Sequence, residues 1–384
     1  METSNRHPDD AAASSKPVDE PAAGDRFGAS APLSIGIEEE LLLIDGRRCL
    51  SPAAEAVLAA IEPQSRERVS TEIFAGQIEL KTGICLDAAQ AAAELAALRR
   101  AVGRTGIGLI GAGLYPGETG ETVLVDKPRY QPVREEFASI LNTPPCGLHV
   151  HVGMPDPETA ITVANAMRLH LPLLQALTAN SPFRDGGDSG LASARMAVVG
   201  SYPRFEMPRA FRDYAEFRRV ADQLILAAGV EDYTYLWWDV RPHPRLGTVE
   251  VRGMDVQTEV GTNAAIAALI QGLAAKEIDR AATPPLAREA VEESYHQAGR
   301  HGLDARLMVD DCTALPAREV ARRTLEEARP YAAQLGGEGA LEEVERILVE
   351  GNGADRQRRV HAEVGIDGLL AHLARRTAGH DGLS

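Results

Sequence analysis

Ionisable residues recur at alternate positions of short apolar segments in this chain. The first case is residues 34–45, where Glu38, Glu39 and Glu40 interrupt a run of Ile and Leu. Because side chains alternate between the two faces of a strand, Glu38 and Glu40 should share one face and Glu39 should point to the other. Neighbouring carboxylates repel each other and are costly to desolvate unless a cation lies between them. The spacing therefore predicts a metal site, with a strand face exposed to water as the alternative.

The same alternation returns in three later segments. Each places ionisable side chains on one face of a strand-like run: Glu72 and Glu79 in residues 72–83, His149 and His151 in residues 147–153, and Glu250 and Arg252 in residues 247–257. Taken singly, each pair fits a face that meets water, but acids and histidines on every strand are unusual for such a face. A set of carboxylates with one or two histidines suits Mg²⁺ or Mn²⁺ better than zinc, which favours His and Cys ligands.

Four arginines lie on nearby segments and could bind a phosphate or a carboxylate through two hydrogen bonds: Arg195, Arg241, Arg245 and Arg252. Acids that hold a divalent cation, surrounded by arginines, are what ATP-driven phosphoryl transfer requires in a chain without a GxxxxGK[ST] motif. Residues 106–111 match the dinucleotide pattern GxGxxG. A predicted helix precedes this segment where the pattern needs a strand, so we interpret it as a glycine-rich strand.

About six strands must position these residues, together with helices that cover the sheet. Several strands follow one another too closely for crossover helices. Helices are predicted over residues 52–62, 88–102, 157–180, 262–281, 286–299, 316–335, 339–350 and 355–378. This arrangement favours an α+β fold with a curved, mostly antiparallel sheet and not a doubly wound one.

Length and composition narrow the function further. The chain has 384 residues and a net charge of −16, which argues against nucleic acid or an anionic membrane as its main partner. The sequence shows no apolar run of membrane-spanning length and no signal-peptide core. The four cysteines form no CxxC pair, so a cytoplasmic location is the simpler expectation. Residues 1–31 are rich in Ala, Ser, Pro and Asp and predict a disordered tail, which leaves 32–384 as one catalytic domain.

Six motifs that occur in order resemble the type 2 glutamate–cysteine ligase family, the carboxylate–amine ligases of the YbdK type. They are Gly36–Leu41, Gly76–Thr82, Cys146–Gly153, Asn180–Phe183, Asp188–Arg195 and Trp237–Asp255, and the resemblance covers roughly residues 33–375. It implies a glutamine-synthetase-like catalytic fold with a funnel-shaped site. It also implies the joining of L-glutamate and L-cysteine into γ-glutamylcysteine through a γ-glutamyl phosphate, with ATP consumed and ADP and phosphate released.

The resemblance also implies roles for single residues. The ligands of Mg²⁺ or Mn²⁺ would be Glu38, Glu40, Glu72, Glu79, His149 and Glu250, with His151 left open between a ligand and a hydrogen-bonding neighbour. Arg252 would act on the transferring phosphoryl group together with Glu38 and Glu250, and Arg195 and Arg241 would bind substrate. The glycine-rich loop 181–194 is a lid candidate, and Glu39, which should face away from the site, is expected to tolerate substitution.

The chain departs from the family pattern at three places near the expected amine site, namely Arg184, Ala194 and residues 205–208. These departures leave the acceptor open, so a ligase that uses another amine is an alternative. A non-catalytic nucleotide-binding homologue and a phosphagen-kinase-like phosphotransferase are further alternatives. The oligomeric state also stays open, and a homo-oligomer is one possibility.

Overall fold

A seven-stranded antiparallel sheet forms the centre of the protein. The computed structural model describes residues 24–137, 140–280 and 286–379. The strand order is β2-β3-β1-β5-β9-β8, and β4 pairs with β1 outside this path. The strands of this sheet are β1 (Ile35–Ile44), β2 (Val69–Thr71), β3 (Gln77–Lys81), β4 (Gly108–Ile110), β5 (Gly147–Gly153), β8 (Val240–His243) and β9 (Thr248–Asp255). The expected α+β class is confirmed, with one short strand, β2, beyond the predicted six.

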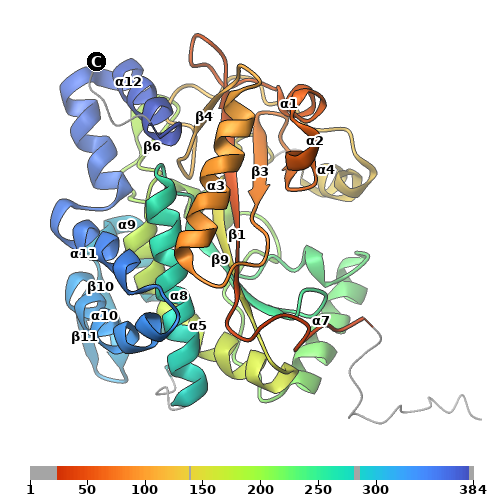
Figure 1. The fold of residues 1–384 in the computed structure, drawn as a ribbon, viewed down its shortest axis with the longest axis vertical. Coiled ribbons are helices and arrows are strands. Elements are labelled where there is room, and N and C mark those ends of the chain that lie inside the picture. The colour runs from red at the N-terminus through yellow and green to blue at the C-terminus, as the bar shows by residue number, and fades with distance from the viewer. Residues whose placement is uncertain (1–23, 138–139, 281–285, 380–384) are drawn as a thin grey trace, which may run out of the picture.

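Helices gather on one face of this sheet and around its edges (Figure 1). They are α1 (Ala54–Ala60), α2 (Pro63–Arg66), α3 (Ala88–Gly103), α4 (Gln131–Phe137), α5 (Pro157–Thr178), α6 (Ala194–Val199), α7 (Tyr214–Ala228), α8 (Val260–Asp279), α9 (Arg288–His301), α10 (Ala317–Gln334), α11 (Leu341–Glu350) and α12 (Gly353–Thr377). Every helix within the described residues is too short or too polar to cross a bilayer.

Local signals in the sequence set several of these boundaries. Asp87 and Asp156 cap α3 and α5, because their carboxylates accept hydrogen bonds from the backbone N–H of Gln90 and Thr159. The GxGxxG segment contains the strand β4, as predicted. Two hairpins escaped prediction because their strands are short: β6 (Phe183–Arg184) with β7 (Gly187–Asp188), and β10 (Arg306–Asp310) with β11 (Thr313–Pro316).

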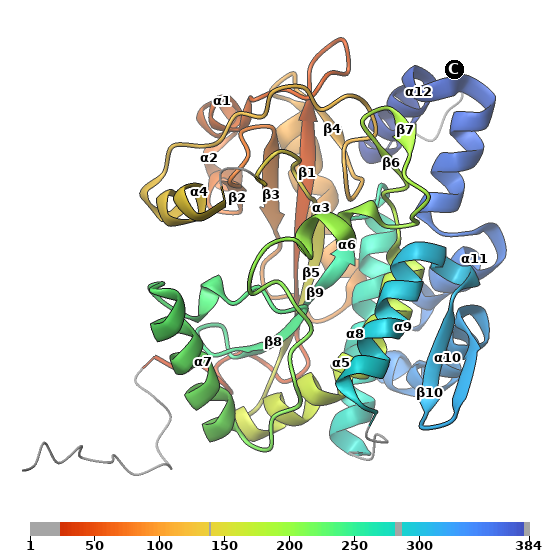
Figure 2. The ribbon, with the colours of Figure 1, turned by 180° about the vertical axis from the view of Figure 1, so that it is seen from behind.

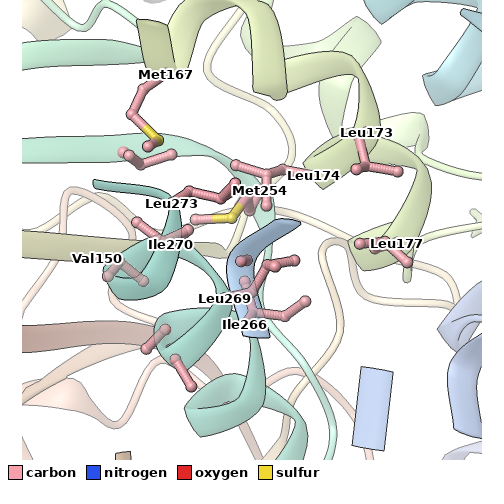
Figure 3. Close-up of a cluster of buried hydrophobic side chains, with 14 of the residues drawn as sticks. Val150, Met167, Leu173, Leu174, Leu177, Met254, Ile266, Leu269, Ile270 and Leu273 are labelled. Atoms are coloured by element: carbon pink, nitrogen blue, oxygen red, sulfur yellow. The ribbon is translucent and has the colours of Figure 1, made fainter. Parts of the chain in front are cut away.

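The main core lies between the sheet and the helices α5 and α8. Figure 3 shows this cluster, in which side chains of α5 and α8 meet Val150 of β5 and Met254 of β9. Val150 alternates along β5 with His149 and His151, so burying the valine under helices turns both histidines to the opposite face. That opposite face is seen in Figure 2, behind α6.

Glu39 lies on the helix-covered face of β1 and is completely buried. Its Oε1 accepts a hydrogen bond from Nε of Arg99 at 2.8 Å, and its Oε2 accepts bonds from Nη2 of Arg99 and Nδ2 of Asn263, both at 2.7 Å. The predicted orientation away from Glu38 and Glu40 is confirmed. The expected tolerance to substitution is revised, because the face to which Glu39 points is packed under α3 and α8 and not exposed to water.

Part of the predicted tail contacts the folded domain. Residues 1–23 lie outside the described residues, but residues 24–31 do not behave as the tail prediction expected. The backbone N–H of Arg26 donates to Pro244 O and that of Gly28 donates to Met154 O, both at 2.9 Å. The Phe27 ring packs edge-on against Tyr214, with ring centroids 5.7 Å apart. This segment therefore closes one end of the polar sheet face.

Candidate active site

The polar face of the sheet lines a cavity of about 830 Å³. Strands β1, β3, β5, β8 and β9 form its floor, and its walls come from α4, α6 and the segments near them, with Lys127, Phe137, Leu141, Val199 and Trp237 among the lining residues. All of the predicted site residues line it: Glu38, Glu40, Glu72, Glu79, His149, Arg195, Arg241, Glu250 and Arg252. Arg245 is not one of the described residues that line the cavity. Its Nη2 instead pairs with Oδ2 of Asp232 at 2.8 Å.

Strand register places these side chains side by side. Glu38 of β1 lies opposite Lys81 of β3 on one side and opposite His149 of β5 on the other. One pleat further along, Glu40 lies opposite Glu79. At the other end of the sheet, His151 of β5 lies opposite Glu250 of β9, which in turn lies opposite Arg241 of β8. Residues more than 200 positions apart in the sequence thus become neighbours on one surface.

Carboxylates crowd the part of the cavity nearest to β3. Burial raises the pKa of Glu72 well above its usual value, and repulsion by Glu79 and Glu40 adds to this shift. Burial likewise raises the pKa of Glu40 and of Glu79. The sequence predicted one strand for Glu72 and Glu79, and this prediction is wrong. Glu72 follows the end of β2, whereas Glu79 lies in β3. The chain turns between the two strands and brings Glu72 back to the cluster.

Lys81 is the cation that the sequence analysis did not assign to the site. Its Nζ lies 2.5 Å from a carboxylate oxygen of Glu79 and 3.4 Å from one of Glu38. The sequence does indicate this position, because Lys81 lies two residues after Glu79 in β3 and must therefore share its face. The single positive charge of Lys81 does not neutralise the four carboxylates Glu38, Glu40, Glu72 and Glu79. A further cation would therefore be stabilised in this cluster.

Candidate metal-binding atoms converge in three overlapping groups. Each group offers ligand atoms within 4.8 Å of one another: Glu38, Glu79 and His149; Glu38, His151 and Glu250; and Glu40, Glu72 and Glu79. The Nε2 atom of His151 is buried without a hydrogen-bond partner among the described residues. It lies 3.8 Å from Oε2 of Glu38 and 3.9 Å from Oε1 of Glu250. An unpartnered nitrogen beside crowded carboxylates fits a site for a hard divalent cation.

His149 is held as a neutral imidazole. Burial, with the charge of Arg252, lowers its pKa to about 4. Its Nδ1 lies 3.2 Å from Oε2 of Glu38, a contact that requires the proton on Nδ1 and leaves Nε2 free to accept or to ligate. Burial alone would raise the pKa of Glu38, but the hydrogen bond from His149, the nearby His151 and the charge of Lys81 lower it well below its usual value.

Two arginines donate hydrogen bonds to the carboxylate of Glu250. Its Oε2 accepts a hydrogen bond from Nε of Arg241 at 2.8 Å, and its Oε1 accepts one from Nη1 of Arg252. Burial would raise the pKa of Glu250, but Arg241 and Arg252 lower it well below its usual value, so this carboxylate is ionised. The Nε atom of Arg252 is buried without a partner among the described residues, and Arg252 lines the cavity.

Comparison with known sequences identifies the protein family of this chain. A sequence model described as "Glutamate-cysteine ligase family 2(GCS2)" matches residues 34–373. The chain belongs to glutamate–cysteine ligase family 2. A relative from Rubrobacter xylanophilus, named "Putative glutamate--cysteine ligase 2-3", is 42% identical over 363 residues, which cover 92% of this chain and 99% of the relative. A relative from Sorangium cellulosum, named "Putative glutamate--cysteine ligase 2", is 34% identical and covers 86% of this chain and 92% of its own length.

Two solved structures share the fold. The glutamate–cysteine ligase of Francisella tularensis, solved in complex with AMP, aligns with a TM-score of 0.68 at 12% identity, covering 91% of this chain and 89% of that chain. The bifunctional glutathione synthetase of Pasteurella multocida aligns with a TM-score of 0.62 at 17% identity, covering 90% of this chain and 51% of that chain. At these identities the likeness establishes the fold. It confirms the fold expected of a glutamate–cysteine ligase.

In this family 2 ligase, Arg195 and Arg241 occupy very different environments. Nη1 of Arg241 donates to the carbonyl oxygens of Tyr233, Thr234 and Leu236 while its Nε holds Glu250. Arg241 is therefore largely occupied in positioning Glu250. The guanidinium of Arg195 is almost completely buried, and its Nε has no hydrogen-bond partner among the described residues. Of the two, only Arg195 has a buried guanidinium nitrogen without a hydrogen-bond partner among the described residues.

Gly147 makes room for the Arg195 guanidinium. A Cβ atom at position 147 would lie 2.5 Å from Nη2 of Arg195 and 3.0 Å from Nε2 of His149. The backbone of Arg195 is fixed from the other side, because its N–H donates to Oγ of Ser181, which itself donates to Asp255. The sequence analysis did not single out Gly147, since the need for glycine there arises only from a contact between distant segments.

The proposed lid does not adjoin the cavity. No residue of loop 181–194 lines it. Instead Asp188 of β7 accepts two hydrogen bonds from Arg358 of α12, at 2.8 and 2.9 Å, and Phe183 packs on His361 of the same helix with ring centroids 4.6 Å apart. The loop anchors α12, visible beside β6 and β7 in Figure 2, and the lid prediction is wrong.

Proposed function

We propose that the chain is an ATP-dependent ligase that joins the γ-carboxylate of L-glutamate to a primary amine; L-cysteine, which the family name indicates, is the first amine to test. One observation carries this proposal: Arg195, a buried guanidinium that forms no ion pair with a carboxylate among the described residues, shares a cavity with a carboxylate cluster and with Arg252. The cavity can therefore receive an anionic substrate and a phosphoryl donor together.

The reaction would proceed in two steps. The γ-carboxylate of glutamate attacks the γ-phosphorus of ATP, which forms the acyl phosphate and releases ADP. The acceptor amine then attacks the acyl carbon, phosphate departs, an amide bond forms and one proton is released. Arg195 would hold the α-carboxylate of glutamate so that the γ-carboxylate reaches the phosphorus in line. Arg252, held by Glu250, would stabilise the charge on the phosphoryl oxygens during transfer.

Mg²⁺ or Mn²⁺ is the cation that we propose for the carboxylate cluster. Glu38, Glu40, Glu72, Glu79, His149 and Glu250 would hold it, and the geometry adds His151 as a further ligand candidate. When bound, such a cation neutralises charge on the nucleotide phosphates. Burial of the site serves the second step, since water would hydrolyse the acyl phosphate. The AMP complex of the Francisella tularensis relative supports an adenine nucleotide as co-substrate.

The proposal is tested by ADP release and product mass together. Purified protein is mixed with MgATP, L-glutamate and L-cysteine, and ADP and the new amide are measured with each component omitted in turn. The proposal expects ADP and amide in equal amounts and only with the complete mixture. A phosphorylated guanidino product without amide would favour the kinase alternative, and nucleotide binding without any product would favour the non-catalytic one.

Glu38→Gln tests the metal assignment directly. The affinity for Mn²⁺, measured by electron paramagnetic resonance, should fall at least about tenfold. Glu38 belongs to two of the three ligand groups, and the substitution removes its charge from both. Glu67→Gln is the matched control, because Glu67 is exposed and lies outside the cavity. Equal Mn²⁺ affinity in the Glu38 variant and the wild type would refute the assignment.

A further inference from the structure

An aromatic wall closes the side of the cavity next to Arg195. We use this name for Phe137, Tyr202, Phe205, Tyr235 and Trp237, which all line the cavity. The Phe137 ring lies 6.4 Å from those of Tyr202 and Trp237, and the Tyr235 ring lies 6.4 Å from that of Trp237. Such an array offers far more apolar contact area than a thiol-bearing side chain can fill.

Arg204 fixes the wall from behind. Its guanidinium lies 5.8 Å from the centroid of Phe137 and 5.7 Å from that of Trp237, so it contacts both rings as a cation–π partner. Two hydrogen bonds to the carboxylate of Glu136, at 3.1 and 3.3 Å, hold the guanidinium in this place. The rings are thus supported as a preformed surface, which lowers the entropic cost of binding a flat or bulky group.

The wall adjoins the end of the cavity at which glutamate would bind. Arg195 and Val199 are one helical turn apart on α6, Tyr202 follows three residues after this helix ends, and all three line the cavity. The Tyr202 hydroxyl is buried without a hydrogen-bond partner among the described residues, and burial raises its pKa to about 12, so it stays a donor. A polar donor, a guanidinium and an aromatic surface therefore meet at one place.

In-line phosphoryl transfer directs the nucleotide away from this wall. The attacking carboxylate oxygen and the leaving oxygen of ADP must lie on opposite sides of the γ-phosphorus. With glutamate held at Arg195, the ADP chain would extend away from that arginine and from the aromatic wall beside it. The aromatic wall then faces the acyl carbon from the glutamate side, which leaves it to the second substrate.

We propose that the aromatic wall selects the acceptor, and that the preferred acceptor is a primary amine with an aromatic or bulky apolar side chain. This inference rests on the proposed ligase function. The amine would attack the acyl carbon with its side chain against Trp237 and Phe137, while phosphate leaves toward Arg252. The departure from the family pattern at residues 205–208 lies on a segment that carries this wall, because it includes Phe205.

The test compares four acceptors that vary the side chain and the carboxylate independently: L-cysteine, cysteamine, L-phenylalanine and 2-phenylethylamine. With MgATP and glutamate, we expect kcat/KM for each ring-bearing amine to exceed that of its thiol counterpart at least tenfold. Trp237→Ala should lower kcat/KM for the ring-bearing amines at least tenfold and leave the KM of ATP within twofold. Trp237→Phe, which retains a ring, should recover most of the loss, and the unchanged KM of ATP shows that the alanine variant folds.

The outcomes separate this inference from the proposed function. Amide formation with a preference for L-cysteine would overturn the aromatic acceptor and leave the ligase function standing. A Trp237→Ala variant whose main defect is a raised KM of ATP would overturn it too, by assigning the wall to the adenine base. Absence of amide with all four acceptors, together with absence of glutamate-dependent ADP release, would overturn the ligase function itself.

Discussion

Replacement of Glu39 by glutamine should severely destabilise this ligase, although Glu39 touches no part of the cavity. The carboxylate accepts three hydrogen bonds, from Nε and Nη2 of Arg99 and from Nδ2 of Asn263. Glutamine has nearly the same shape, but its amide NH₂ must point either at Arg99 Nε or at the pair of donors facing the other oxygen. Either orientation sets donor against donor and leaves a buried guanidinium without a counter-ion.

The cost follows from the burial of the pair. The side chains of Arg99 and Glu39 are 3% and 0% exposed, so neither charge can recover hydration after the change. Removing one partner of such a buried pair costs about 3–5 kcal/mol. That is a large part of the roughly 5–15 kcal/mol by which proteins are commonly stable. Arg99 also donates to Thr258 O, Gln257 O and Thr377 O, which ties β1 to the start of α8 and the end of α12.

Urea unfolding followed by circular dichroism measures this cost. Glu94→Gln, on the same helix as Arg99, is the matched control, because Glu94 pairs with Arg68 at the surface with side chains 26% and 45% exposed. The control should lose no more than about 1 kcal/mol of unfolding free energy. A loss below about 1 kcal/mol for Glu39→Gln, equal to that of the control, would refute the reasoning from buried charge.

Three further outcomes follow from single residues. Gly147→Ala should raise the KM of glutamate at least tenfold with little loss of stability, because the nearest atoms to the added Cβ are the side-chain ends of Arg195 and His149 and no backbone, whereas Gly261→Ala, which meets no atom within 4 Å, should be neutral. Burial raises the pKa of Asp239 to about 6, so the folded state disfavours its charged form and its contribution to unfolding free energy is lost as pH rises from 4 to 7. Asp239→Asn should remove about 2 kcal/mol of that pH dependence in urea titrations, and parallel curves for variant and wild type would contradict the assignment. Arg241→Lys should lower kcat more than it raises the KM of glutamate, since it loosens Glu250; the reverse pattern would return Arg241 to substrate binding.

Alternation along strands is what made the site predictable from sequence. A period of two separates Glu38 and Glu40 from Glu39, and His149 and His151 from Val150, whatever surrounds the strand. The same rule places Lys81 on the face of Glu79, so its position in the site was also predictable. Helix ends at Asp87 and Asp156 were equally local, since a cap requires only the residues of the first turn.

Tertiary structure alone decided what each face of a strand meets. The sequence could place Glu39 opposite to Glu38, but the distance between position 39 and Arg99 or Asn263 in the chain gave no sign that the three would bury together. It likewise could not show that Arg241 is occupied by backbone carbonyls while Arg195 is not, nor that Gly147 leaves space for Arg195. These are contacts between segments far apart in sequence, and local periodicity carries no information about them. The sequence by itself therefore determined which residues share a surface, and the packing of that surface decided which of them remain free to bind substrate.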